Sequence, residues 1–145
     1  MTRKAILAAV SLAVASTLVA TGQTTRRVGE GNYLGDVTGE DVYIRAFPPR
    51  GYPCIKVSKP VRLVVLGERN GWLKIAPPAG CYSLIAKRFV QAAGETGVVK
   101  GRNVNVRAGS DLMPTRIDSI QTQLNTGDQV RILGQRGEYY KIAPP

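Results

Sequence analysis

The sequence predicts an all-β fold made of two small, similar units. The pair Asn70-Gly71 separates two β-prone apolar runs, and this is the strongest short-range signal for a β-hairpin, because both residues accept the positive φ of a type I′ turn. Residues 134–145 repeat residues 67–78 with 7 identities over 12 aligned positions. The mature part of the chain has no helical periodicity, and its short runs are punctuated by Gly and Pro, as in a β-barrel or β-sandwich.

The N-terminus is typical of a secretory signal peptide. Arg3 and Lys4 form a basic start, an Ala-rich apolar run extends to residue 15, and Ala20 and Gly22 are small residues suited to cleavage. A membrane anchor or a buried helix is the alternative, but the run is short for about 30 Å of hydrocarbon. We therefore expect a signal helix in residues 1–22, membrane contact only during export, and a secreted or periplasmic location in the cell envelope.

The chain is strongly basic. It has 145 residues and a net charge of +10, and removal of residues 1–22 takes away two cations and no anion, leaving +8. Such a charge favours anionic partners: nucleic acid, anionic lipid or the acidic polymers of a cell envelope. Export makes nucleic acid the least expected of these. A basic surface that only keeps a small protein soluble is an open alternative.

Two cysteines, Cys54 and Cys81, predict one disulfide. An even count in an oxidising compartment favours pairing. Closing a loop of about 27 residues would stabilise a marginal small core by roughly 3.5 kcal/mol. Two separate buried thiols are the alternative.

The first unit is expected over residues 33–91. Alternating residues 42–45 predict a half-buried strand, and the three prolines of residues 47–53 predict an irregular loop. The hairpin pairs residues 61–66 with residues 72–76. A further strand over residues 81–85 would then complete this unit.

The second unit is expected over residues 96–145, after a small, polar linker at residues 91–96. Residues 99–108 align with residues 37–46, and the following loop is five residues longer than in the first unit. No counterpart of strand 81–85 precedes the end at Pro145, so this unit is predicted to lack its last strand and to expose an unpaired edge. A fragment of a longer protein and an edge completed by another chain, through oligomerisation, are the two explanations.

Catalysis has little support in the sequence. Histidine is absent, which removes the commonest general base. Carboxylates are scattered, and the adjacent pair Glu40-Asp41 is better explained by a solvated turn. No metal-ligand spacing and no Gly-rich phosphate loop is present. We therefore expect a protein with no catalytic residues, no metal and no cofactor.

Three segments together resemble bacterial SH3 (SH3b) domains. These are Val-x-x-Gly-x-x-Val-Asn-Val-Arg-Ala-Gly at residues 98–109, Leu-Asn-x-Gly-Asp-x-Val at residues 124–130 and Gly-x-x-x-x-Tyr-Tyr-Lys-Ile at residues 134–142. Residues 72–83 are similar to a cysteine-bearing variant of the family. The first unit departs from the pattern at Tyr43, which stands where the second unit has Asn105.

The resemblance implies two SH3-like barrels in tandem, acting as an extracytoplasmic binding module for cell-wall peptides or envelope proteins. A targeting arm of a peptidoglycan hydrolase, whose catalytic domain is absent from this chain, is one alternative. A general module for anionic polymers is another.

Aromatic and basic side chains on the predicted strands are the candidate ligand contacts. Alternation places Trp72 and Lys74 on the outer face and Leu73 and Ile75 on the inner face. Stiff aromatic rings with polar tips suit peptide or glycan stems, although Trp72 lying flat over a gap in the barrel is an open alternative. The candidate set is Tyr43, Trp72, Tyr82, Tyr139, Tyr140, Lys74 and Lys141.

Overall fold

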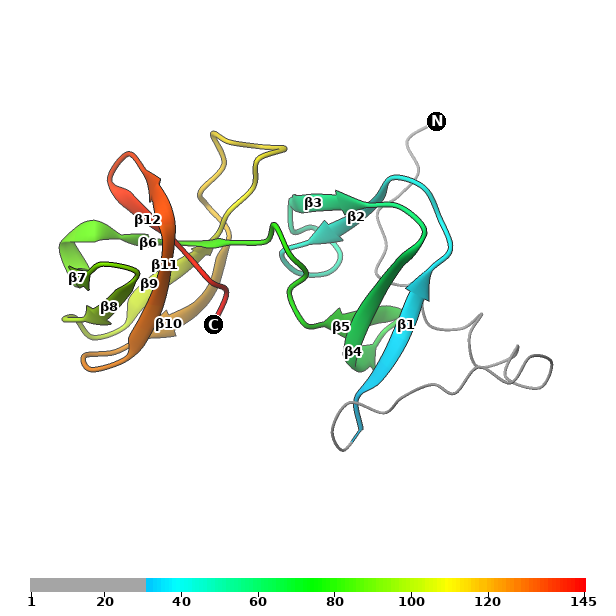
Figure 1. Ribbon diagram of the computed structural model, residues 1–145, viewed down its shortest axis with the longest axis horizontal. Coiled ribbons are helices and arrows are strands. Elements are labelled where there is room, and N and C mark those ends of the chain that lie inside the picture. The colour runs from blue at the N-terminus through cyan, green and yellow to red at the C-terminus, as the bar shows by residue number, and fades with distance from the viewer. Residues whose placement is uncertain (1–30) are drawn as a thin grey trace.

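The structure, a computed structural model, describes residues 31–145 and is all-β over that range (Figure 1). The predicted all-β class is thereby confirmed. Its helical content is one 3-10 turn, η2 (Lys87–Phe89), and no helix among these residues is long and apolar enough to cross a membrane. The predicted signal helix lies outside the described residues.

Two sheets form the first unit. A three-stranded antiparallel sheet has the order β1-β4-β5, and a separate two-stranded sheet pairs β2 with β3. Alternate residues of both sheets meet in one apolar core, which includes Ile44, Val65 and Leu73. The strands are β1 (Tyr33–Val37), β2 (Val42–Arg45), β3 (Pro53–Val57), β4 (Val61–Arg69) and β5 (Trp72–Ile75).

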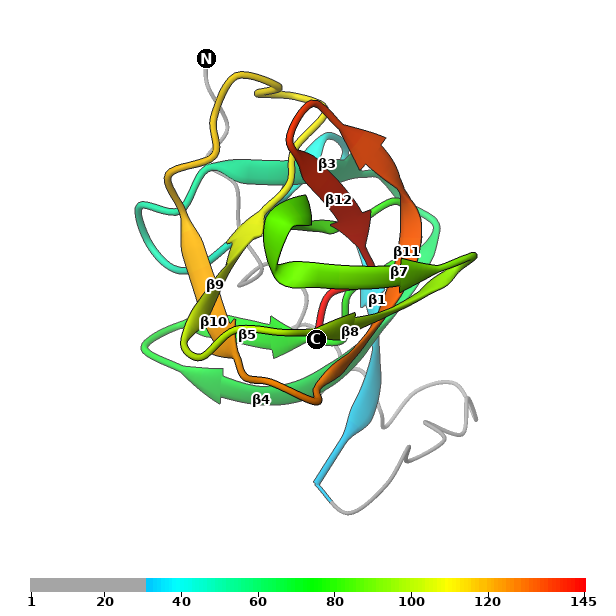
Figure 2. The same cartoon turned by 90° about the vertical axis from the view of Figure 1, so that its left-hand side faces the viewer.

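A seven-stranded antiparallel sheet, with the order β10-β9-β6-β12-β11-β8-β7, forms the second unit and curves round its own core (Figure 2). Ile85, Val99, Val106 and Ile142 are fully buried there. The strands are β6 (Ser83–Ala86), β7 (Val90–Ala93), β8 (Thr96–Val99), β9 (Val104–Ala108), β10 (Ile120–Leu124), β11 (Gln129–Arg136) and β12 (Tyr139–Ile142).

The strand registers repeat between the units. A shift of 62 residues carries β1 and β2 onto β8 and β9, and a shift of 67 carries β3, β4 and β5 onto β10, β11 and β12. Gly35 pairs with Leu63, and the shifted residues Gly97 and Val130 pair in the second unit. The register irregularities of β3 and β4 recur at the same places in β10 and β11. The two units are therefore equivalent in their strand pairing as well as in sequence.

The strand that follows the first Pro-Pro segment is placed differently from the prediction. The sequence assigns residues 81–85 to the first unit, but β6 lies between β9 and β12 of the second (Figure 1). Ser83, Leu84 and Ile85 are fully buried there. The predicted unpaired edge of the second unit is therefore absent at β12, because β6 and β11 pair with its two sides.

The expected linker is also part of the second unit. Residues 91–96 were predicted to separate the units, yet β7 and β8 form a hairpin across them, with Gly94 at a φ of 61° in the turn. Small residues were mistaken for a linker because a tight turn requires the same composition. The connection between the units lies earlier, at residues 76–82.

The predicted hairpin turn is confirmed. Asn70 and Gly71 both have positive φ, 53° and 73°, as a type I′ turn requires. The turn predicted at Glu40-Asp41 is present as a bend between β1 and β2, and its left-handed residue recurs: Asp41 and Asn103, which are 62 residues apart, have φ of 52° and 51°. Asp and Asn tolerate this left-handed conformation better than other non-Gly residues.

The placement of β6 gives a stability prediction. Because Ile85 is fully buried in the second core, Ile85→Ala is expected to lower the free energy of unfolding by about 2–5 kcal/mol. Hydrogen exchange should quicken in β9 and β12 and stay unchanged in β1 and β4. Leu133→Ala, at a side chain 50% exposed on β11, is the matched control and should cost under about 0.5 kcal/mol. Faster exchange in β2 and β5 alone would contradict the placement.

Candidate functional site

A pocket of about 420 Å³ lies between β2 and β5 of the first unit. These two strands belong to different sheets and do not pair with each other. Gln121 and Pro144 of the second unit line it as well, together with Tyr82 of the connection. The lining from the first unit consists of Ile44, Arg45, Ala46, Phe47, Pro48, Cys54, Arg69, Trp72, Leu73, Lys74, Ile75 and Pro77, together with Cys81 of the connection.

All charged side chains that line the pocket are cationic. Arg45, Arg69 and Lys74 line it, and the lining contains no carboxylate. None of the three forms an ion pair with another described residue. The Arg45 guanidinium donates a hydrogen bond of 2.7 Å to the Gly51 carbonyl, which holds it beside the loop after β2. An anionic group entering the pocket would meet three cations that have no carboxylate partner among the described residues.

Strand alternation positions the side chains of β5. Leu73 is 1% exposed and packs into the first core, whereas Lys74 is exposed. Trp72 is half-buried: it packs against the edge of the core and also lines the pocket. The indole therefore both covers part of the first core and borders the pocket.

The predicted disulfide is wrong in this structure: both cysteines are free thiols. Cys54 is buried on β3 beside Tyr52 and Ala108, and Cys81 lies on the connection that leads into β6. The prediction placed the chain after Cys81 in the first unit, whereas β6 carries it into the second. Burial raises the pKa of each thiol to about 11, so both behave as small apolar groups in the pocket wall.

The candidate residues divide into two groups. Trp72, Lys74 and Tyr82 line the pocket, and the Lys141 ammonium lies 4.3 Å from the centre of the Tyr82 ring. The other three tyrosines are not among its lining. Tyr43 lies on β2, 4.9 Å from the Lys56 ammonium, while Tyr139 and Tyr140 lie on β12 and the latter packs against the second core.

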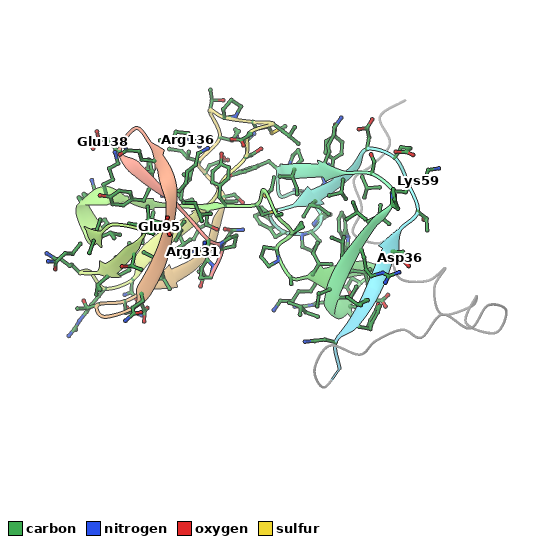
Figure 3. All side chains as sticks on the ribbon, viewed as in Figure 1. Asp36, Lys59, Glu95, Arg131, Arg136 and Glu138 are labelled. Atoms are coloured by element: carbon green, nitrogen blue, oxygen red, sulfur yellow. The ribbon has the colours of Figure 1, made fainter. Side chains whose placement is uncertain are left out.

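Tyr82 is the centre of a polar cluster where the connection meets the second unit. Its hydroxyl donates to the Asp111 carboxylate at 2.8 Å and accepts from the Arg136 guanidinium at 3.1 Å. Figure 3 shows Arg136 at the end of β11, above the sheet. Burial and the Asp111 contact raise the pKa of Tyr82 to about 12, and the hydrogen bond from Tyr82 lowers the pKa of Asp111. The ring of Tyr82 also packs against Gly109, where a Cβ would collide with it.

Further hydrogen bonds join the two units directly. The Tyr52 hydroxyl donates to the Ala108 carbonyl, and the Ser110 hydroxyl donates to the Pro53 carbonyl at 2.7 Å. Both Tyr52 and Ser110 are buried. Because each bond crosses from one unit to the other, the pocket wall formed by the second unit is held in place.

Sequence reasoning missed most of the loop side of the pocket. Phe47 and Pro48 were recognised as parts of an irregular loop but not as ligand contacts, and Arg69 was seen only as part of the hairpin. Asp111 and Arg136 gave no sequence signal, since their role depends on Tyr82 of a distant segment. Arg45 was detectable, because it recurs as Arg107.

Comparisons with known proteins find no relative. No family model, no curated protein and no solved structure matches this chain. Among residues 31–145 no group of three or more Cys, Asp or Glu side chains is placed to hold a metal ion.

The Tyr82 cluster predicts a pH-dependent contribution to stability. The pKa of Asp111 is lowered, so its contribution is fully present above the ordinary value of 3.8 and is lost as the pH falls below it. Asp111→Asn is expected to cost up to about 1 kcal/mol at neutral pH, since its side chain is 71% exposed, and little at about pH 3. Urea unfolding at both pH values measures this, with Glu138→Gln as the control. An equal cost at both pH values would contradict the assignment.

The raised thiol pKa values predict slow alkylation. A shift from 9.0 to about 11 lowers the thiolate fraction roughly 100-fold at about pH 8. Iodoacetamide should therefore modify the folded protein at least about 100-fold more slowly than the urea-unfolded protein. Mass spectrometry of the single variants Cys54→Ser and Cys81→Ser separates the two sites. Rapid reaction at either thiol in the folded state would show that its burial is wrong.

Proposed function

We propose that this protein is an exported, non-catalytic binding module, and that the pocket between β2 and β5 holds peptide segments of the cell wall or of envelope proteins. The pocket carries the proposal. Its lining combines Trp72 with three cations and several apolar side chains, and such a combination suits a peptide with an anionic group. The basic composition of the chain supports an anionic partner in the same way.

Binding is favoured over catalysis by the groups in the pocket. Its lining offers no carboxylate and no histidine, so a general base is lacking. Its two thiols have pKa values near 11, which keeps them protonated and poorly nucleophilic at neutral pH. Arginine, lysine and tryptophan can recognise a ligand without transforming it.

We further propose that both units belong to the SH3b family, as a tandem pair of small, partly open barrels. Support comes from the motifs of the second unit and from the repeated registers, which indicate that one compact all-β unit was duplicated. Export is supported by the pattern of residues 1–22. A general affinity for anionic polymers is the second candidate, favoured by the unpaired cations of the pocket.

Binding to isolated cell-wall sacculi tests the function. The protein without residues 1–22 is expected to co-sediment with sacculi, and Trp72→Ala is expected to weaken binding at least about tenfold, as loss of a buried aromatic contact does. Tyr139→Ala is the matched control, because Tyr139 is the equivalent residue of the second unit and does not line the pocket.

Salt distinguishes the two candidates. Screening at about 0.5 M salt reduces the range of charge–charge attraction to a few Å. Binding that is lost at this salt concentration and is unchanged by Trp72→Ala would favour the anionic-polymer candidate. Absence of co-sedimentation above that of a charge-matched protein would refute wall binding.

A further inference from the structure

The second unit contains a strand for which the first unit has no described counterpart. β6 lies between β9 and β12, joining them into one sheet. The equivalent strands of the first unit, β2 and β5, remain in separate sheets. The position that β6 occupies between β9 and β12 in the second unit thus corresponds, among the described residues of the first unit, to a gap between the edges of β2 and β5.

The pocket coincides with this gap. Ile85 of β6 pairs with Val106 and Tyr140, whose equivalents in the first unit are Ile44 and Leu73. Leu84 pairs with Arg107 and Lys141, whose equivalents are Arg45 and Lys74. Ile44, Leu73, Arg45 and Lys74 all line the pocket.

The same correspondence holds at both ends of β6. Ser83 pairs with Ala108 and Ile142, equivalent to Ala46 and Ile75. Ala86 pairs with Tyr139, equivalent to Trp72. These equivalents also line the pocket. Every residue that would pair with an added strand is therefore a lining residue of the pocket.

A side-chain contact supports the register. The Ser83 hydroxyl donates to the Gln121 side chain at 2.6 Å, and Gln121 lies at the irregularity of β10. A shift of 67 residues places Cys54 at the matching irregularity of β3, and Cys54 lines the pocket. The first residue of an added strand would therefore lie beside a buried thiol.

We propose that this gap, called here the open strand slot and defined by β2 and β5, binds an extended acidic peptide as an added β-strand. The inference rests on the proposed binding function and specifies its ligand and mode. A strand paired on one edge directs alternate N–H and C=O groups to its other edge, so β5 offers unpaired backbone groups to a guest. The same holds for β2, whose one partner strand among residues 31–145 is β3.

The flanking residues define the guest. Its third position, equivalent to Ile85, lies between buried Ile44 and Leu73 and requires a branched apolar side chain. Its second position, equivalent to Leu84, lies between Arg45 and Lys74. In the second unit Lys141 already contacts Asp111, whereas Lys74 forms no ion pair among the described residues, so the slot favours Asp or Glu at that position. The expected pattern is small, acidic, branched apolar, small.

A second copy of this chain is a weaker candidate for the guest. Residues 31–145 contain one β6 segment for two equivalent slots, so exchange of β6 between copies leaves one slot per chain without a β6 strand. A peptide from another molecule can fill it without emptying the second unit.

Synthetic peptides test the slot. The probe spans residues 81–93 of this chain with Cys81→Ser, with and without Leu84→Glu. The peptide carrying Leu84→Glu is expected to bind about 3- to 10-fold more tightly at low salt, because it faces two cations. N-methylation of the amide at position 85 is expected to weaken binding at least about tenfold, since a central strand uses that donor.

Hydrogen exchange and a charge swap locate the bound peptide. Amides of residues 44–46 and 72–75 should gain protection when the peptide binds. Lys74→Glu should abolish the preference for the acidic peptide, whereas Lys100→Glu, the same charge change at an exposed residue of the second unit, should leave it intact. Protection that changes only in β9 and β12 would mean that the peptide replaces β6, and would overturn the proposal.

A thiol capture fixes the register. In a Cys81→Ser background, a peptide with a pyridyl-activated cysteine at position 83 should form a mixed disulfide with Cys54 and release pyridine-2-thione. The Cys54 thiolate attacks the activated sulfur, and bound peptide supplies the high local concentration that a thiol of pKa near 11 needs. Cysteine at position 84 should react much more slowly. Equal capture at both positions would overturn the register.

Failure of the slot and failure of the proposed function give different results. If sacculi binding is sensitive to Trp72→Ala but the acidic peptide does not protect β2 and β5, the proposed binding function is supported and the strand-addition proposal is refuted. Peptide addition between β2 and β5 without sacculi binding would leave the slot and point to a soluble envelope protein as ligand.

Discussion

Strand β6 is hydrogen-bonded along both of its edges, and this pairing organises both units. Ser83, Leu84 and Ile85 are fully buried, and buried N–H and C=O groups must find partners. β9 and β12 supply those partners on the two sides. The second unit thereby gains a continuous seven-stranded sheet, and the first unit keeps two sheets with a pocket between them.

The position of β6 in the second sheet also determines how the two units are connected. A chain that leaves β5 and enters the second sheet must cross from one unit to the other, and Tyr82 lies at the end of that crossing, next to β6. Its ring packs on Gly109 and its hydroxyl joins Asp111 to Arg136. Together with the bonds from Tyr52 and Ser110, these contacts make the second unit one wall of the pocket.

The two units share their strand pairing but differ in the side chains around the position of β6. The two units keep the same registers, the same hairpin position and the same flanking cations, Arg45 with Arg107 and Lys74 with Lys141. They differ in the residues that meet the inserted strand: Cys54 replaces Gln121 and Trp72 replaces Tyr139. One position binds part of its own chain, and its more apolar counterpart is the slot for which we propose a peptide ligand.

Local elements of this protein could be predicted from its amino-acid sequence. Asn70-Gly71 predicts one turn, alternation predicts a buried Leu73 and an exposed Lys74 on β5, and the two shifts of 62 and 67 residues predict the equivalence of the units. Which unit receives β6, where the pocket lies and whether the cysteines pair become known from the folded chain. The reason is physical: turn and strand patterns depend on neighbouring residues, whereas insertion of a strand depends on distant edges. Here both possible edges carry nearly the same residues, so no short-range signal could choose between them.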